Sequence, residues 1–449
     1  MREHPARQHL ERLIARAQSP LLQHTYTALH ADEARLQLEH ALSRPATAAA
    51  SGPLQGHVVA VKDLFDLAGQ VTRAGSGLFG SQGLKHAPAR CDAEAVKRLK
   101  AAGAIVLGRT NMSEFAFSGV GINPHDGTPR NPCDLKIARI PGGSSSGSAV
   151  AVAAHAADVG LGTDTGGSLR IPAALCGIVG FKPTAASVPA DGCFPLSRSL
   201  DSIGAMTRSV TQAAIAHGVL SAAPVDLGTA QPLRGYRLGI TTSYFTENMD
   251  STVRQAWTQT LLRLKSAGAQ LVDWDSPLPA QAAALQSGAS LVTIEAYELH
   301  QAWLAQHAEH YDPRVLARIG LGQVPAERAA AVRSARGNWI QTMAQALNEF
   351  DAILSPTVPI VAPPLADLAP GAARDDAFFA ANALLLRNTS VINFLDGCAI
   401  SIPCHRPVDL PVGLMIWHGA GHDHDVLRIA SRIEEVLDAP QTQPIETRA

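Results

Sequence analysis

Short apolar runs alternate with segments of helical periodicity along much of this chain of 449 residues. A β-branched run at residues 57–63 predicts a strand that ends at Lys62, and residues 104–108 predict another strand. Between them, Asp92 is expected to cap a helix that ends at Gly103. Strand, helix and strand in this order favour an α/β protein with parallel strand pairing.

The first 45 residues are predicted to be helical, because apolar residues recur there at helical spacing. Residues 46–53 are predicted to be a connector. No repeat, low-complexity tail or composition shift marks a second domain, so we expect residues 1–45 to pack as a helical segment on a single domain of residues 46–449. The apolar positions of the first segment are Leu10, Leu13, Ile14, Leu36, Leu38 and Leu42.

The rest of the chain continues the α/β pattern around a long irregular segment. Residues 119–147 are dense in glycine, proline, asparagine and serine, which is typical of a functional loop. An alanine-rich helix is predicted from Ser148 to about Ala157, before a strand with the sequence VGLGTD and a short helix with the sequence IPAALCG. Further strands are predicted at residues 236–240, 270–275, 351–356, 398–403 and 411–417, and helices at residues 251–268 and over most of 290–349.

Composition excludes several classes of protein. Hydrophobic residues make up 46% and charged residues 17%, which excludes a mostly disordered chain. The 37 basic and 39 acidic residues balance, and aromatics are only 5%, so we expect no nucleic-acid partner. The N-terminus lacks a secretory pattern, and the longest apolar stretch (SAVAVAAHAADVG) is too short to span a membrane. With six scattered cysteines, the expected setting is a reducing cytoplasm, without membrane attachment.

Three features carry residues suited to chemistry: Lys62, the loop at residues 142–148 (GGSSSGS) and the loop at residues 164–170 (DTGGSLR). Lys62 can simply mark the point where a strand meets water. The first loop can be a flexible turn or an anion cradle, although the P-loop pattern is absent because no Gly-Lys-Ser/Thr follows. The second loop can be an ordinary turn with Ser168 as a helix N-cap.

Ser145 stands in a formal G-x-S-x-G pattern, which is typical of the nucleophile elbow of α/β-hydrolases. That elbow requires a hydrophobic strand directly before it, whereas residues 134–141 (DLKIARIP) make a poor strand that ends in proline. The chain has no HExxH motif, and its 17 histidines form no i, i+4 pair with a glutamate. We therefore expect no metal site and no cofactor.

Together these features favour nucleophilic catalysis. A serine hydroxyl is a weak nucleophile and needs a base. Lys62 follows four apolar residues, and burial shifts a lysine towards the neutral amine that can act as that base. Residues 165–168 contain two glycines, whose conformational freedom lets backbone N–H groups converge on an oxyanion. These residues alone leave open which serine attacks.

Longer motifs connect these features. They are GRTNMSEFAFSG, TPRNP, RIPGGSSSGSAVAVAA and LGTDTGGSLRIPAALCGIVGFKPT, with HVVAVKDLFD and TRAGS before them and DAILSPTVP and PVGLMI after them. Over most of residues 50–430 the chain resembles the amidase signature family. The resemblance implies a mixed central β-sheet flanked by α-helices on both faces, with N-terminal helices, and a Ser–cisSer–Lys triad.

The resemblance also assigns roles to individual residues. Ser168 matches the acyl-accepting nucleophile, Lys62 the base, and Ser144 the serine with a cis peptide bond that relays the proton between them. The oxyanion-hole positions match Thr165, Gly166, Gly167 and Ser168. Ser145 matches a second, supporting serine, and Asp164 and Arg170 match a structural ion pair around the nucleophile loop.

Three kinds of amide chemistry are compatible with this resemblance. The first is a free-standing amidase, expected to be a homodimer, that converts a small carboxylic amide to an acid and ammonia or an amine. The second is the glutaminase component (the A subunit) of a tRNA-dependent amidotransferase. Residues 381–397 depart from the glutamine-binding pattern, because leucines and Arg387 stand where an acidic residue is expected. The third is a carboxybiuret or allophanate hydrolase, although allophanate enzymes usually carry an extra C-terminal domain.

The substrate pocket is predicted at two places in the chain. Phe115, Ala116 and Phe117 follow Asn111 where family members line the acyl pocket, or else form ordinary core. Arg318 is expected to meet a substrate carboxylate, or else to be a surface or packing arginine. Apolar walls and an arginine would suit a modest aryl or short aliphatic acyl group.

Overall fold

The described strands form one mixed sheet in this computed structural model, which describes residues 4–43, 52–80, 83–228 and 232–438. The strand order is β1-β3-β2-β4-β6-β5-β10-β11-β9-β7-β8. β2 pairs in parallel with β3 and β4, and β7 pairs in parallel with β8 and β9, whereas the other pairs are antiparallel. The strands are β1 (Tyr26–Leu29), β2 (Val58–Lys62), β3 (Ile105–Thr110), β4 (Val159–Asp164), β5 (Val179–Lys182), β6 (Ser202–Thr207), β7 (Arg237–Thr241), β8 (Gln270–Trp274), β9 (Ala352–Pro356), β10 (Cys398–Pro403) and β11 (Gly413–His418).

Helices cover both faces of this sheet. Successive side chains of a strand point to opposite faces, so neighbouring residues of one strand pack against different helices. Val59 and Val61 of β2 pack in one cluster with Val96 of α3, whereas Ala60 packs in another with Ala149 of α4. The helices are α1 (Pro5–Ala17), α2 (Ala31–Ser43), α3 (Glu94–Ala101), α4 (Ser146–Ala153), α5 (Arg170–Cys176), α6 (Val210–Ser221), α7 (Ser251–Ser266), α8 (Leu278–Leu285), α9 (Leu291–His307), α10 (Pro313–Gly320), α11 (Ala326–Leu347), α12 (Leu365–Leu368), α13 (Asp375–Leu395) and α14 (Asp423–Asp438).

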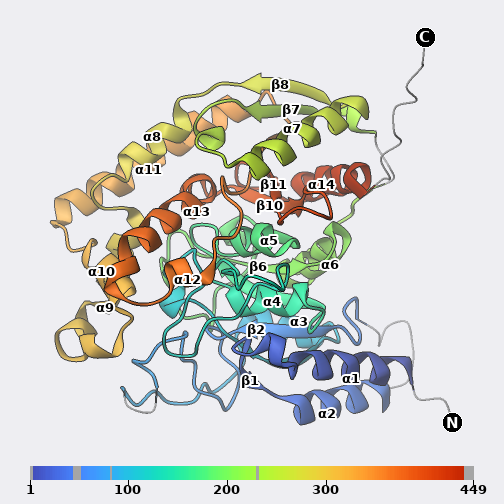
Figure 1. Ribbon diagram of the computed structural model, residues 1–449, viewed down its shortest axis with the longest axis vertical. Helices are drawn as coiled ribbons and strands as arrows, with labels where there is room; N and C mark the ends of the chain where they lie inside the picture. The colour runs from blue at the N-terminus through green and yellow to red at the C-terminus, as the bar shows by residue number, and fades with distance from the viewer. Residues whose placement is uncertain (1–3, 44–51, 81–82, 229–231, 439–449) are drawn as a thin grey trace.

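The far part of the sheet repeats this two-faced packing. Leu414 and Ile416 of β11 lie in a cluster with α7 and α14, whereas Met415 and Trp417 lie in a cluster with α11 and α13. Figure 1 shows α1 and α2 side by side at the β1 end of the molecule and α7 beside β7 and β8 at the opposite end. The predicted fold class, a mixed central sheet flanked by helices, is confirmed.

The N-terminal segment differs from its predicted helical character. Between α1 and α2, β1 pairs antiparallel with β3 and so lies at the edge of the sheet. All four residues of β1 are of intermediate burial, so they show no alternation of buried and exposed positions. Pairing with β3, and not local propensity, therefore makes this segment a strand. Leu36 is wrongly placed by the helical pattern, since it is 71% exposed. The predicted connector at residues 46–53 lies mostly outside the described residues, as does the proposed boundary at residue 45.

Two other local predictions are corrected. Asp92 does not cap α3, because the N-cap residue is Ala93 and the Asp92 carboxylate instead accepts hydrogen bonds from the Ala68 N–H and the Lys100 ammonium. The helix after the serine loop begins at Ser146 and ends at Ala153, earlier at both ends than predicted. The strand β6, which the sequence pattern did not indicate, pairs antiparallel with β4 and β5.

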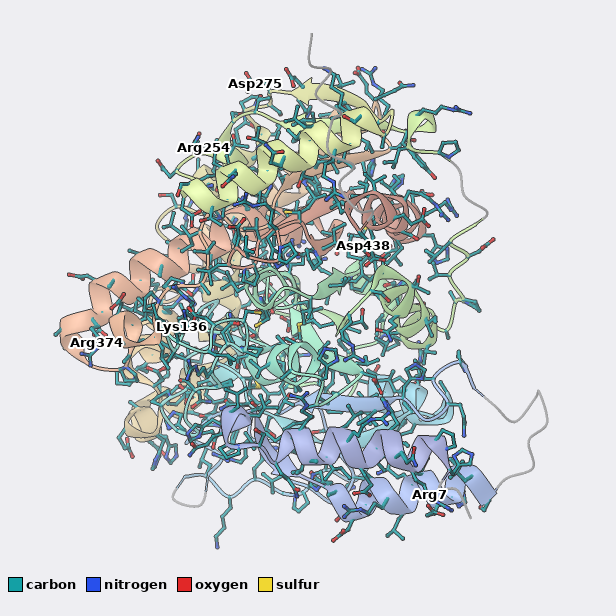
Figure 2. All side chains as sticks on the ribbon, turned by 45° about the vertical axis from the view of Figure 1, so that its right-hand side comes forward. Arg7, Lys136, Arg254, Asp275, Arg374 and Asp438 are labelled. Atoms are coloured by element: carbon teal, nitrogen blue, oxygen red, sulfur yellow. The ribbon has the colours of Figure 1, made fainter. Side chains whose placement is uncertain are left out.

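The surface carries charges of both signs, in keeping with the formal net charge of −2. The labelled side chains of Arg254, Asp275 and Arg374 project at the outside of the molecule (Figure 2). No helix in the described part of the chain is long and apolar enough to cross a membrane.

Candidate active site

Lys62, the predicted base, is the last residue of β2 and is fully buried. Its Nζ donates hydrogen bonds to Ser144 Oγ at 2.8 Å and to Thr163 Oγ1 at 2.9 Å. Burial lowers the pKa of Lys62 to about 7, against the opposing influence of Cys193, Asp201 and Asp164. About half of such amines are neutral at pH 7, compared with about one in 2,500 for an unperturbed lysine.

Ser144 lies just before α4 and is joined to Gly143 by a cis peptide bond, as the family resemblance implied. The neighbouring Ser145 is also buried, and its hydroxyl donates to the Thr163 carbonyl at 3.3 Å. A Cβ atom on Gly162 would lie 2.7 Å from Ser145 Oγ, so glycine is needed for the serine loop to approach β4 this closely. The loop therefore places Ser144 directly against the end of β2.

The loop from Thr165 to Ser168 lies beside the serine loop, since the Ser145 N–H donates to the Ser168 carbonyl at 3.3 Å. Among the described residues, none accepts a hydrogen bond from the backbone N–H groups of Gly166, Gly167 or Ser168. Gly167 has a φ of 135°, and a Cβ there would lie 2.2 Å from the hydroxyl of Thr389. The loop thus has the unpaired donors and the glycine conformation that an oxyanion hole needs.

Asp164 and Arg170 form a fully buried, two-pronged ion pair that holds this loop. Arg170 Nη2 lies 2.9 Å from Asp164 Oδ1, and Arg170 Nε lies 3.0 Å from Oδ2. Burial alone would raise the pKa of Asp164, but the charge and hydrogen bonds of Arg170 lower it to about 2. Asp164 Oδ2 also accepts from the Leu169 N–H at the start of α5, and the N-cap residue of that helix is Leu169, not Ser168.

Ser168 opens onto a cavity of about 240 Å³. Ala116 and Phe117, two of the residues expected to meet substrate, line this cavity, and so does Arg318. The guanidinium carbon of Arg318 lies 4.2 Å from the Phe117 ring centroid, and the side chain donates to the Phe117 carbonyl. Burial lowers the pKa of Arg318 to about 10. Among the described residues that line the cavity, Arg318 is the one charged side chain. The others are Ser118, Gly119, Thr165, Gly166, Leu196, Leu200, Ala283, Gln286, Ser290, Val292, Leu386 and Ser390.

Phe115, by contrast, does not belong to the lining of this cavity. Its ring packs 4.4 Å from the His300 ring, 5.3 Å from Tyr311 and 5.4 Å from Phe194, measured between centroids. Of the three consecutive residues predicted to meet substrate, Phe115 is therefore placed in the aromatic core behind the pocket.

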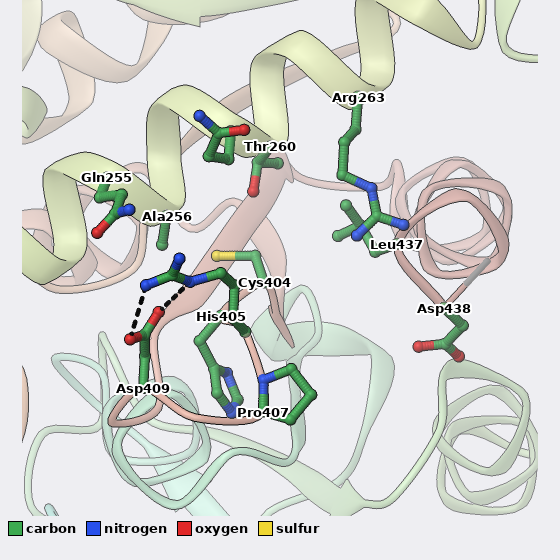
Figure 3. A pocket seen from close by; sticks show the side chains of 12 residues that line it. Gln255, Ala256, Thr260, Arg263, Cys404, His405, Pro407, Asp409, Leu437 and Asp438 are labelled. Carbon is green, nitrogen blue, oxygen red and sulfur yellow. Dashed lines mark hydrogen bonds and ion pairs between the residues drawn. The ribbon is translucent and has the colours of Figure 1, made fainter. Parts of the chain in front are cut away.

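A larger cavity of about 670 Å³ lies elsewhere, between α7, the loop after β10 and the end of α14 (Figure 3). Arg406 and Asp409 form an ion pair at its wall, and burial raises the pKa of the Cys404 thiol to about 12. It contains none of the predicted catalytic residues and no activated nucleophile among its lining residues, so its size does not make it the active site.

Potential metal ligands gather at one place in the described part of the chain. His307, Glu309 and His310 lie at the end of α9, with their ligand atoms within 4.8 Å of one another. None of the three lines the cavity at Ser168. The i, i+3 spacing of the two histidines is not the i, i+4 pattern sought in the sequence.

Thr163 and Asn393 also lie at the site, although the sequence analysis did not single them out. Thr163 accepts a hydrogen bond from Lys62, although in the sequence it is only one residue of a glycine-containing strand. Asn393 of α13 donates to Asp164 and accepts from Arg170 at 2.7 Å. A polar residue in the otherwise apolar run VINFL was the available signal for Asn393.

Comparisons with known proteins agree with this geometry. The Amidase family model matches residues 8–427. The chain is 34% identical to 2-amino-5-chloromuconic acid deaminase of Comamonas testosteroni, and the match covers 86% of this chain and 82% of the relative. It is 32% identical to the A subunit of glutamyl-tRNA(Gln) amidotransferase of Koribacter versatilis, and that match covers 86% of this chain and 85% of the relative. A crystal structure of an amidase superposes with a TM-score of 0.83 and 32% identity over 95% of both chains.

The chain belongs to the amidase signature family. It is therefore a hydrolase of C–N bonds.

Proposed function

We propose that the protein is an amidase that converts a small carboxylic amide to an acid and ammonia or an amine through an acyl-enzyme at Ser168. The observation that carries this proposal is the 2.8 Å hydrogen bond between the buried Lys62 Nζ and Ser144 Oγ, beside a cavity that Ser168 lines. Burial supplies an amine that is neutral near pH 7, and Ser144 supplies the route by which it reaches the nucleophile.

In the proposed reaction, neutral Lys62 takes the proton of Ser144 as Ser144 takes that of Ser168, whose oxygen attacks the amide carbon. The N–H groups of residues 166–168 stabilise the negative charge on the carbonyl oxygen. The protonated lysine then returns a proton through Ser144 to the departing amine. Water attacks the Ser168 ester with the same relay as base, which releases the acid and restores the enzyme.

We further propose that the substrate carries a carboxylate on its acyl part. Arg318 is half-buried in the cavity wall, where its side chain contacts the carbonyl and ring of Phe117, neither of which neutralises its charge. A carboxylate can pair with such a guanidinium through charge-assisted hydrogen bonds. The walls from Phe117, Leu196 and Leu386 suit a short aliphatic or aryl body. The deaminase relative, whose name denotes an acidic compound, supports this choice.

Arg318→Leu is expected to lower kcat/KM for carboxylate-bearing amides about 10-fold to 100-fold, because it removes hydrogen bonds between charged groups. The change should lie mainly in KM, and uncharged amides of the same size should lose little. Steady-state assays on matched acid and neutral amide pairs measure this. Arg387→Leu on α13, outside the lining, is the control; an equal loss for both substrates in Arg318→Leu would contradict the assignment.

The amidotransferase alternative has support from the relative in Koribacter versatilis, which is similar over most of both chains. Glutamine needs an acidic partner for its α-ammonium, however, and the described lining offers no aspartate or glutamate. At the stretch predicted to depart from the glutamine pattern, Leu386 and Ser390 face the cavity.

Ammonia release from a panel of amides by the purified chain, the expected homodimer, tests the proposed function. We expect turnover of small acidic amides without any partner or cofactor. Turnover of glutamine alone, and only after addition of a small partner protein, would favour the amidotransferase. Turnover of carboxybiuret or allophanate alone would favour the urea-derivative hydrolase.

A further inference from the structure

Asp201 is a half-buried carboxylate that bridges two walls of the active site. Its Oδ1 accepts a hydrogen bond from Thr165 Oγ1 at 2.6 Å. Its Oδ2 accepts from the backbone N–H groups of Leu196 at 2.9 Å and Ser197 at 3.2 Å. The sequence analysis assigned no role to this residue, which immediately precedes β6.

The sheet register explains why Asp201 reaches the nucleophile loop. β4 and β6 are antiparallel, and Asp164 pairs with Ser202, so the next residue of β4, Thr165, lies across from the preceding residue of β6, Asp201. Thr165 begins the loop that leads to Ser168, and both line the cavity. Leu196, held by the other oxygen of Asp201, lines the same cavity. One carboxylate therefore connects the oxyanion loop to the wall of the acyl pocket.

Asp201 also lies within the electrostatic field of Lys62. Burial raises the pKa of Asp201 to about 6, and its hydrogen bonds and the charge of Lys62 oppose that rise, so near pH 7 the carboxylate is mainly ionised. The other groups that act on Lys62 are Cys193 and Asp164. Burial raises the pKa of the Cys193 thiol, which stays neutral, and Asp164 is paired with Arg170. Of these three groups, Asp201 is therefore the one whose negative charge acts on Lys62 without being paired to an arginine.

We propose that Asp201 is a positioning residue that holds the Thr165 loop against the pocket wall, and that its negative charge sets the pH range over which Lys62 serves as base. This inference rests on the proposed function of Lys62 and Ser168. It assigns Asp201 no contact with the substrate: the residue acts through Thr165 and through the charge it places near the amine.

Asp201→Asn tests both parts of the proposal. The amide keeps the shape of the side chain and one acceptor oxygen, but it removes the charge and one of the two acceptors. Without the nearby anion, protonated Lys62 is less stable, so its pKa falls and the acid limb of the kcat/KM profile moves to lower pH, by about half a unit to one unit. We expect kcat to fall about 10-fold to 100-fold, because the oxyanion donors are less well held.

Glu295→Gln is the matched control, since Glu295 anchors the same loop from outside. Its carboxylate accepts from Ser197 Oγ at 2.6 Å and from the Ser199 N–H at 3.0 Å, without acting on Lys62. This variant should lose loop stability with an unshifted pH profile. Thr165→Val should lower kcat, also without a pH shift, whereas Thr165→Ser, which keeps the hydroxyl, should retain most of kcat.

A pH profile of Asp201→Asn that overlies the wild type, or a kcat within about twofold of it, would overturn the inference. If Asp201→Asn does not fold, Thr165→Val supplies the positioning test, and a kcat for it within about twofold of the wild type would overturn that part. Failure of the proposed function is recognised separately, because wild-type enzyme would then neither hydrolyse amides nor become acylated at Ser168.

Discussion

Lys62→Arg is expected to lose amide hydrolysis by about 10³-fold or more, because a guanidinium stays protonated throughout the working pH range and cannot accept a proton. The side chain remains long and cationic, so the loss isolates proton transfer from charge. Lys62→Ala should lose a similar amount on amides. Its loss on an activated ester should be smaller, since that leaving group departs without a proton.

The pH dependence of the wild type follows from the same residue. The neutral amine is the active form, and the pKa of Lys62 lies at about 7 because of burial. The acyl-transfer rate should therefore rise with pH through a single ionisation near 7 and level off above it, with no histidine required. Stopped-flow measurement of the acylation rate between pH 5 and 9 tests this rise. For the Lys62→Arg variant, the control is Lys97→Arg at a half-exposed position on α3, which should keep wild-type turnover. Near-wild-type amide turnover by Lys62→Arg would contradict the role of Lys62 as base.

Ser168→Ala is expected to lower amide turnover by about 10⁴-fold or more, as for other enzymes whose nucleophile is removed. A serine-reactive phosphonate, followed by peptide mass mapping, should place the label on Ser168. Ser145 lies at the centre of the G-x-S-x-G pattern, but its hydroxyl donates to the Thr163 carbonyl and it is not part of the cavity lining. Ser145→Ala should therefore still be labelled, at a reduced rate. Label on Ser145 with Ser168 unmodified would overturn the assignment of the nucleophile.

The strands that carry the site could be predicted because their signals are local. Four of the five residues of VVAVK are apolar and three of them are β-branched, so β2 and its terminal lysine were predictable without any neighbour. The same holds for the serine loop before α4 and the DTGGS loop after β4, whose glycines mark close approach and unusual dihedrals. β1 was missed because it is a strand only through its pairing with β3, a contact that no window of sequence contains.

The motifs of the sequence were enough to show the resemblance to the amidase signature family, and it was this resemblance, more than residue spacing, that selected Lys62, Ser144 and Ser168 as candidate catalytic residues. The folded chain was needed to place Phe115 behind the pocket and Arg318 in its wall, and to bring Thr163 and Asp201 around the lysine. Burial and electrostatic environment depend on which distant segments the sheet brings together. Because the pKa of Lys62 depends on both, no local pattern of residues could have revealed it.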